Sequence, residues 1–256
     1  MYPDRKKFVL EPFMLVPIFS GKSYTKKVIN IDPANLAGYW PMNEASGATA
    51  DNAEGTAARD GTYTGVTLGQ PGIGDGNTCP YFDGANDIMN LNSASLGAAC
   101  ISDEMTIMCW AKVANAGVWT DGLWAYIMVL TYGSSTDLMW IIKSNVNNKL
   151  QFNTEWGNGG PTVPQFTPIS TTDWMHLAIT MSVSADEVWA YVNGVKTSGV
   201  PGSGMLTQLD IVLDPVRALV GARHSTVVDC FNGYIAHAAI WTSALTPAQI
   251  AELAAV

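Results

Sequence analysis

Short apolar runs separated by turn residues dominate the chain from residue 37 onward. Each run has the length of a β-strand, and glycine, asparagine and aspartate gather between the runs. The runs that predict strands are 106–112, 138–142, 174–181, 187–192, 218–221 and 234–241. Many short strands with regular turns predict an all-β fold, an antiparallel two-sheet jelly-roll sandwich.

Two local signals add detail to this pattern. Asn193-Gly194 follows one of the predicted strands and favours a two-residue hairpin turn, because both residues accept positive φ. Near the end of the chain, Thr246, Pro247 and Gln249 form an N-cap, a first-turn proline and a capping box. The sequence therefore predicts a short C-terminal helix that packs an apolar stripe on the sheets.

The N-terminal segment lacks this pattern and is interrupted by prolines. It holds six basic and three acidic residues, a net charge of +3, so that the remainder carries −12 within a chain of −9. We expect an extended basic N-terminal arm over residues 1–36 and one jelly-roll domain over residues 37–256. The basic residues assigned to the arm are Arg5, Lys6, Lys7, Lys22, Lys26 and Lys27.

Composition narrows the classes of function. Charged residues make up 14% of the chain, against about 25% in an average soluble domain, so we expect part of the surface to be buried against neighbouring subunits. The net charge of −9 argues against nucleic-acid binding, which needs clustered lysine and arginine. No apolar stretch reaches the length of a membrane helix. The segment that most resembles a secretory signal is interrupted by Glu11, Pro12 and Pro17, which argues against a signal peptide.

The sequence offers little for catalysis. Glycoside hydrolysis uses two carboxylates about 5–10 Å apart, yet no acidic pair stands two residues apart, the spacing that shares one strand face. There is no Gly-x-Ser-x-Gly elbow, and the three histidines are isolated. The four cysteines lack the Cys-x-x-Cys spacing of a zinc site, and their disulfide state stays open. We predict that the chain is not an enzyme.

A series of segments carries a further pattern. They are GYWPMNEASGATAD at 38–51, DGTY at 60–63, FDGAND at 82–87, TIMCWAK at 106–112, WMHLA at 174–178, YVNG at 191–194, and FNGYI, IW and ALT between 231 and 246. In this order they resemble the laminin-G-like jelly-roll family of the concanavalin A-like lectin/glucanase superfamily. The resemblance covers residues 37–256, implies the same sandwich fold and leaves the arm outside.

The resemblance also implies a metal. Many members of this family bind calcium through a few carboxylates and backbone oxygens, which makes Asp51, Asp83 and Asp87 the candidate ligands here. The alternative is that these aspartates form turns and bond their own backbone. The chain departs from the family where Ala236 and His237 replace an acidic pair, so any role of that pair is absent.

Aromatic residues are the candidates for sugar contact. Trp119, Trp124 and Trp156 lie off the clear strands, and Asn158 stands beside Trp156 in a glycine-rich loop, a combination suited to a glycan site. The alternative is that they cover sheet edges or subunit contacts. The tryptophans on apolar strands are instead expected to fill the core between the sheets; these are Trp110, Trp174, Trp189 and Trp241.

Two binding roles follow. We favour a structural protein of a large assembly, on the surface of a virus or phage particle, as a decoration, fibre or tail component. Its arm would join neighbouring copies or other subunits in a homo-oligomer, and its lectin-like jelly roll would contact host glycans. The alternative is a free or secreted extracellular carbohydrate-binding or adhesion module. A glycoside hydrolase ranks third, and fold alone does not decide among them.

Overall fold

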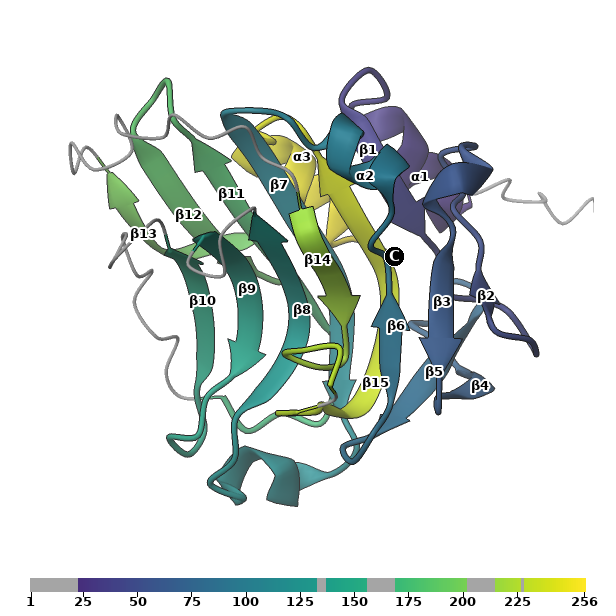
Figure 1. Ribbon diagram of the computed structural model, residues 1–256. Helices are drawn as coiled ribbons and strands as arrows, with labels where there is room; N and C mark the ends of the chain where they lie inside the picture. Colours follow the sequence, from purple (N-terminus) through teal and green to yellow (C-terminus); the bar gives the residue numbers. More distant parts are fainter. Residues whose placement is uncertain (1–22, 133–136, 156–168, 202–214, 227) are drawn as a thin grey trace, which may run out of the picture.

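The computed structural model describes residues 23–132, 137–155, 169–201, 215–226 and 228–256. Two antiparallel sheets pack face to face in it, as the sequence predicts (Figure 1). The larger sheet runs in the order β13 (Val195–Pro201), β12 (Glu187–Val192), β11 (Met175–Ser182), β7 (Glu104–Val113), β15 (Asn232–Trp241), β5 (Thr78–Asp83) and β4 (Thr67–Pro71), with β1 (Leu36–Trp40) paired to β15. The seven-stranded sheet runs in the order β10 (Leu150–Glu155), β9 (Asp137–Lys143), β8 (Ala125–Tyr132), β14 (Pro215–Val220), β6 (Ile88–Asn90), β3 (Gly61–Thr64) and β2 (Thr49–Ala50).

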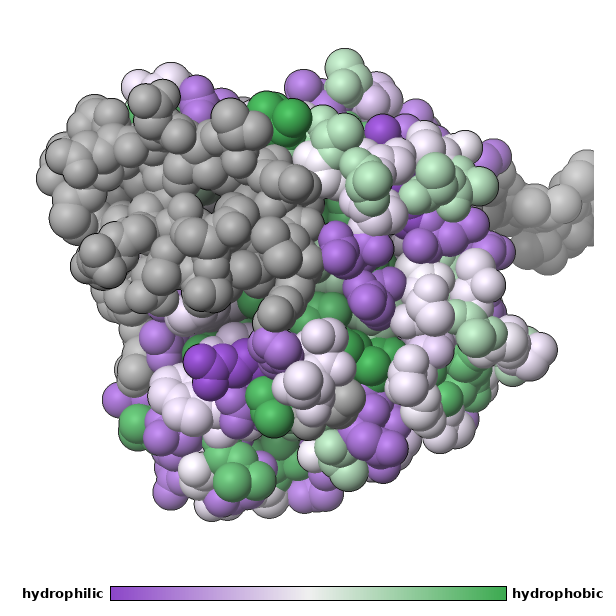
Figure 2. Space-filling model, viewed as in Figure 1, coloured by the Kyte–Doolittle hydropathy of each residue, from purple (hydrophilic) through white to green (hydrophobic). Residues whose placement is uncertain are grey.

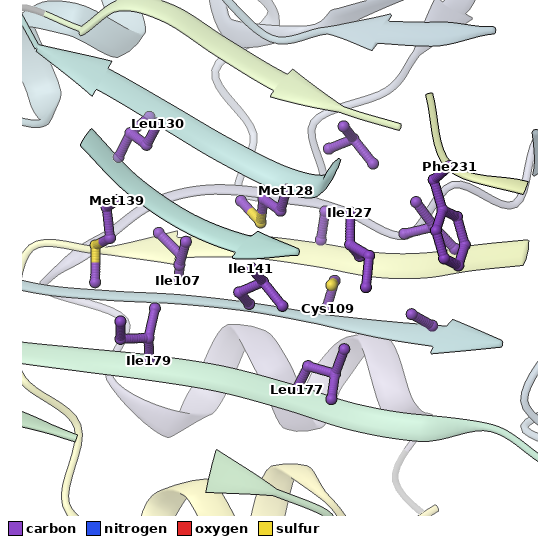
Figure 3. Packing of buried hydrophobic residues seen from close by; sticks show 14 of the residues in the cluster. Ile107, Cys109, Ile127, Met128, Leu130, Met139, Ile141, Leu177, Ile179 and Phe231 are labelled. Atoms are coloured by element: carbon purple, nitrogen blue, oxygen red, sulfur yellow. The ribbon is translucent and has the colours of Figure 1, made fainter. Parts of the chain in front are cut away.

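The core between the sheets follows the two-residue period of the strands. Ile107 and Cys109 of β7 point inward, and they meet Ile141 of β9 and Ile127 of β8 from the opposite sheet (Figure 3). A register shift in β8 beside Ile127 turns both Ile127 and Met128 to this core. The same shift leaves Tyr126, the residue before Ile127, on the outer face of the sheet, where the candidate site lies.

Helices cover the outer face of the eight-stranded sheet. They are α1 (Tyr24–Ile31) and α3 (Pro247–Leu253), which lie side by side (Figure 1). The short helix α2 (Ala94–Ala99) and the 3-10 helices η1 (Ala57–Arg59) and η2 (Ala116–Thr120) lie elsewhere. Trp110 and Trp241 are buried in this second apolar cluster, and Trp174 and Trp189 are half-buried against it. The prediction that they fill the core between the sheets is wrong, because the helices make the outer face of the sheet apolar as well.

The N-terminal segment differs from the prediction of an extended arm. Residues 24–31 form α1, and its Tyr24 and Val28 are buried on the body of the same chain. β1 then pairs with β15 within the domain. The apolar residues Tyr24 and Val28 stand one helical turn apart, so a helix places both side chains on the face that packs against the domain. Residues 1–22, with Arg5, Lys6, Lys7 and Lys22, lie outside the described residues.

The local predictions for the C-terminal half are confirmed. Asn193 and Gly194 both have positive φ and join β12 to β13 in a tight hairpin. Thr246 and Gln249 make the reciprocal bonds of a capping box at the start of α3, with Pro247 in its first turn. The six predicted strands correspond to β7, β9, β11, β12, β14 and β15.

Two further features concern the state of the cysteines and the length of the helices. All four cysteines are free thiols, and burial raises the pKa of Cys79 and Cys100 to about 12. Within the described ranges, no helix has the length and apolar character needed to cross a lipid bilayer.

Candidate functional site

An aromatic hollow lies on the outer face of the seven-stranded sheet. It has a volume of about 250 Å³ and is lined by Trp124, Tyr126, Trp140, Ile142, Gln151 and Arg223. Three aromatic rings, one aliphatic side chain, one amide and one guanidinium therefore meet at this place. Figure 2 views the molecule from the side of this sheet, where hydrophobic and hydrophilic residues mix on the described surface. We refer to these six residues as the aromatic hollow.

Strand alternation builds the floor of the aromatic hollow. The register shift in β8 keeps Tyr126 on the outer face, directly opposite Ile142 of β9. Trp140 stands two residues before Ile142 and shares its face, and Gln151 of β10 is paired with Ile142 from the other side. The rings of Tyr126 and Trp140 meet edge to face at 5.8 Å between centroids. This geometry is favourable for aromatic pairs and fixes both rings.

A buried cation fixes the turn that carries Trp124. Lys143 at the end of β9 is 1% exposed, contacts the Asp121 carboxylate and donates to the carbonyl oxygen of Leu123 at 2.8 Å. Asp121 also accepts from the Leu123 backbone N–H at 2.8 Å. Because the ammonium group is paired from two directions, the turn is held in one position. Trp124 follows it immediately and is half-buried at the edge of the aromatic hollow.

A chain segment from the other end of the sequence adds Arg223. The segment after β14 returns along β8, where Tyr126 N–H donates to the Asp229 carbonyl oxygen at 2.9 Å. Arg223 lies 5.8 Å above the Tyr126 ring and reaches the Asp229 carboxylate at 3.3 Å. The side chain of Arg223 is 59% exposed. A cation stacked on a ring at the mouth of the aromatic hollow remains accessible to a ligand.

The tryptophans predicted as sugar contacts have different positions. Trp124 lines the aromatic hollow, and its sugar contact stays a prediction. Trp119 is 1% exposed and its Nε1 donates to the Thr171 carbonyl oxygen at 2.7 Å, so no ring face is left for a sugar. That assignment is wrong because η2 turns the ring into the core. Trp156 and Asn158 lie outside the described residues.

The three aspartates predicted as calcium ligands do not form one site. Asp83 and Asp87 share a turn, but Asp87 accepts from the Asp83 N–H at 2.8 Å and Asp83 accepts from the Ala85 N–H at 2.7 Å. Asp51 follows β2, beside the opposite end of β3. Across the described part of the chain, no group of three metal-ligating side chains gathers. The aspartates fit the alternative of turn formation better than a shared calcium site.

Two of the lysines predicted for the arm, Lys26 and Lys27, lie within the described residues and belong to α1. Lys27 Nζ donates to the Ala255 carbonyl oxygen and, at 3.3 Å, to the Glu252 carbonyl oxygen. It therefore closes the C-terminus of α3 rather than reaching away from the body. Lys26 stands beside it on the helix and is exposed.

Sequence reasoning missed Tyr126, Trp140, Gln151 and Arg223. Trp140 stood within a predicted strand, but a wholly apolar run does not indicate which residues face outward. Tyr126 would have been found by testing the residues that follow Trp124 for strand alternation. Arg223 carries no local signal, because its place depends on a chain return of nearly one hundred residues.

Comparison with known families supports the fold. Residues 83–251 match the family described as the concanavalin A-like lectin/glucanases superfamily. No curated protein matches the chain.

Solved structures are similar in fold at low sequence identity. A Trypanosoma rangeli sialidase in complex with sialic acid matches with a TM-score of 0.64 and 12% identity over 86% of this chain. The chain spans 33% of the sialidase, so the match gives no support for catalysis. The botulinum neurotoxin serotype C1 binding domain matches with a TM-score of 0.61 and 14% identity, over 88% of this chain and 52% of that one.

Another match is a complete domain of similar extent. Domain 4 of AbnA, a GH43 extracellular arabinanase from Geobacillus stearothermophilus solved in complex with arabinotriose, has a TM-score of 0.55 and 18% identity. The match covers 86% of this chain and 98% of that domain. These similarities establish a lectin-like jelly roll.

Proposed function

Because the chain belongs to the concanavalin A-like lectin/glucanase superfamily, we propose that it is a non-catalytic carbohydrate-binding module with its sugar site in the aromatic hollow. The observation that carries the proposal is the convergence of Trp124, Tyr126 and Trp140 with Gln151 and Arg223. Sugars present apolar C–H faces to aromatic rings and hydroxyl groups to amides and guanidinium groups, so this set of side chains suits them.

The comparisons add support to the proposal. The arabinanase domain, which is matched over 98% of its length, was solved with arabinotriose, an oligosaccharide. The arabinanase is an extracellular enzyme, and we propose that this chain also acts outside the cell or on a particle surface. Contact with host glycans is part of the same proposal and depends on the aromatic hollow.

The side chains of the aromatic hollow argue for binding over hydrolysis. Among the described residues, no carboxylate lines it. Hydrolysis of a glycosidic bond canonically requires an acid and a second carboxylate on either side of the scissile bond. Asp229 at its mouth is paired with Arg223 at 3.3 Å. A bound sugar would therefore be held and released without bond cleavage.

Glycan arrays test the proposal. The wild-type chain should bind a defined set of glycans, and Trp124→Ala should weaken that binding about tenfold or more, because it removes one stacking face. Trp174→Ala is the matched control, since Trp174 is a half-buried tryptophan immediately before β11 of the opposite sheet. Equal binding by wild type and Trp124→Ala would contradict a sugar site in the aromatic hollow.

A role in a large assembly remains a second candidate. Its support is the charged fraction of 14% and the basic residues before residue 23. The packing of α1 on its own domain restricts any arm that reaches a neighbouring subunit to residues 1–22. In this proposal the chain is anchored to a particle such as a virion, as a homo-oligomer, and the jelly roll faces outward. The two candidate roles are compatible within one protein.

A further inference from the structure

Two buried polar atoms near the aromatic hollow are unpaired. Trp140 on β9 and Asn153 on β10 stand directly opposite each other in the strand register. Trp140 Nε1 and Asn153 Oδ1 are both buried, and neither has a hydrogen-bond partner among the described residues. Asn153 as a whole is 5% exposed. Buried polar atoms are almost always paired, so an unpaired donor and an unpaired acceptor on adjacent strands point to a missing partner.

The chemistry of the two atoms defines the partner. An indole N–H only donates, and an amide oxygen only accepts. A hydroxyl group donates one hydrogen bond and accepts others, so one hydroxyl can satisfy both atoms. Directly opposed residues have Cβ atoms about 5 Å apart, so the two side chains stand next to each other on the outer face. Trp140 lines the aromatic hollow, and Gln151 places the outer face of β10 there as well.

The charges at the mouth restrict the kind of sugar. Arg223 and Asp229 form an ion pair at 3.3 Å, so a positive and a negative group stand side by side. Together they offer donors and acceptors to neighbouring hydroxyl groups of one sugar ring. A carboxylate on the ligand would meet Asp229 as well as Arg223. It would also approach a body with a net charge of −12 over residues 37–256.

We propose that the aromatic hollow takes one ring of a neutral sugar, with one hydroxyl group held between Trp140 Nε1 and Asn153 Oδ1. The inference rests on the proposed function and specifies its ligand. The volume of about 250 Å³ is below the roughly 300–1,000 Å³ of sites for drug-sized molecules, which suits a single ring. A longer glycan would project past Arg223 into solvent.

Matched pairs of glycosides test the charge preference. The probes are methyl β-D-glucopyranoside against its glucuronic acid analogue and methyl β-D-galactopyranoside against its galacturonic acid analogue, titrated by NMR at 50 and 500 mM NaCl. In at least one pair the neutral member should bind about fivefold more tightly, with an affinity independent of salt. Tighter binding of the acid, weakened by salt, would overturn the neutral-sugar inference and leave the binding function standing. Glycan-array signals without binding of any methyl glycoside would overturn the single-ring inference alone.

Two conservative variants test the hydroxyl position. Trp140→Phe removes the unpaired N–H and keeps most of the ring, whereas the control Trp119→Phe removes an N–H that donates to Thr171 at 2.7 Å. Trp140→Phe should lower the affinity for the neutral glycoside about fivefold without lowering the melting temperature of the free protein. Trp119→Phe should lower the melting temperature and leave the affinity unchanged.

The outcomes distinguish the position of the hydroxyl group from the proposed sugar binding itself. Unchanged affinity in Trp140→Phe, together with loss of binding in Trp124→Ala, would place the sugar in the aromatic hollow but overturn the hydroxyl position. Unchanged affinity in both variants would overturn the proposed function as well. A fall in melting temperature without loss of affinity would mean that Trp140 Nε1 stabilises only the fold.

Discussion

His176 acquires its properties from its surroundings rather than from a local motif. Its ring lies fully buried on the outer face of β11, 5.4 Å from the Trp110 ring. Neither ring nitrogen has a hydrogen-bond partner among the described residues. Burial disfavours the charged imidazolium and lowers the pKa of His176 to about 3. The residue is therefore neutral in the folded protein at any pH near neutrality.

The low pKa of His176 predicts acid sensitivity. The unfolded chain binds a proton at His176 near pH 6.5, while the folded chain does so near pH 3, so stability falls as the pH drops below 6.5. Between pH 7 and 5.5 this histidine should remove about 1 kcal/mol of unfolding free energy. Urea unfolding at a series of pH values measures the loss.

A phenylalanine variant isolates this contribution. His176→Phe keeps a ring against Trp110 and removes both unpaired nitrogens, so it should be at least as stable as wild type at pH 7.5. The stability difference between variant and wild type should widen on acidification to pH 5.5. A constant difference across this range would show that His176 does not cause the acid sensitivity.

At the scale of elements, one hydroxyl group connects three parts of the fold. Tyr24 OH in α1 accepts from Trp110 Nε1 of β7 at 2.7 Å and donates to the Leu253 carbonyl oxygen of α3 at 2.6 Å. Burial raises the pKa of Tyr24, which stays protonated and able to donate. The hydroxyl group thus ties the N-terminal helix to the sheet and to the C-terminal helix.

Removal of this hydroxyl group should be costly. Tyr24→Phe leaves the indole N–H of Trp110 and the carbonyl oxygen of Leu253 without their partner, and we expect a loss of about 2 kcal/mol of unfolding free energy. Tyr234→Phe is the control, because Tyr234 lies on the same sheet face but is only half-buried. Chemical unfolding of both variants at pH 7.5 gives the comparison. Equal losses would contradict a special role for the Tyr24 hydroxyl group.

The elements differ in how far the sequence predicts them. The strand over 187–192 coincides with β12, because apolar residues and an Asn-Gly turn are local signals that agree. α1 was missed because its Thr, Val, Ile and Asn residues have poor helix propensity, and its stability comes from packing against β1, β7 and α3. Its signal was the apolar pair Tyr24 and Val28 at helical spacing.

The residues of the candidate site also differ in how far the sequence predicts them. Trp124 was predictable because an aromatic residue in a turn-rich segment stands out from its neighbours. Tyr126 was overlooked although strand alternation from Trp124 would have found it, whereas Trp140 stands in a wholly apolar run that does not indicate which side chains face outward. Trp119 stands in the same segment as Trp124 but turns into the core. Side-chain direction in such loops depends on tertiary contacts that the sequence does not display.

At the scale of the whole molecule, the two outer sheet faces have different neighbours. α1 and α3 cover part of the eight-stranded sheet (Figure 1). The aromatic hollow lies on the outer face of the seven-stranded sheet. Anchoring of the chain through its N-terminal segment would therefore leave the aromatic hollow available for a ligand. The proposed binding role and the proposed assembly role would therefore not compete for the same residues.

Light scattering on a size-exclusion column tests the assembly role. The comparison is between the full chain and a chain that begins at Ser23, because removal of α1 would unfold the cluster around Tyr24. If residues 1–22 join subunits, the full chain should assemble and the shortened chain should remain a folded monomer. Monomers in both cases would contradict self-assembly through this segment.

The most direct test of the central claim follows the nine tryptophan side chains in a ¹H–¹⁵N NMR spectrum. The neutral oligosaccharide with the strongest array signal is added to the wild-type chain. A sugar in the aromatic hollow should shift the indole signals of Trp124 and Trp140, while those of Trp174 and Trp189 on the opposite sheet stay in place. Shifts confined to Trp174 and Trp189 would contradict the assignment of the sugar site.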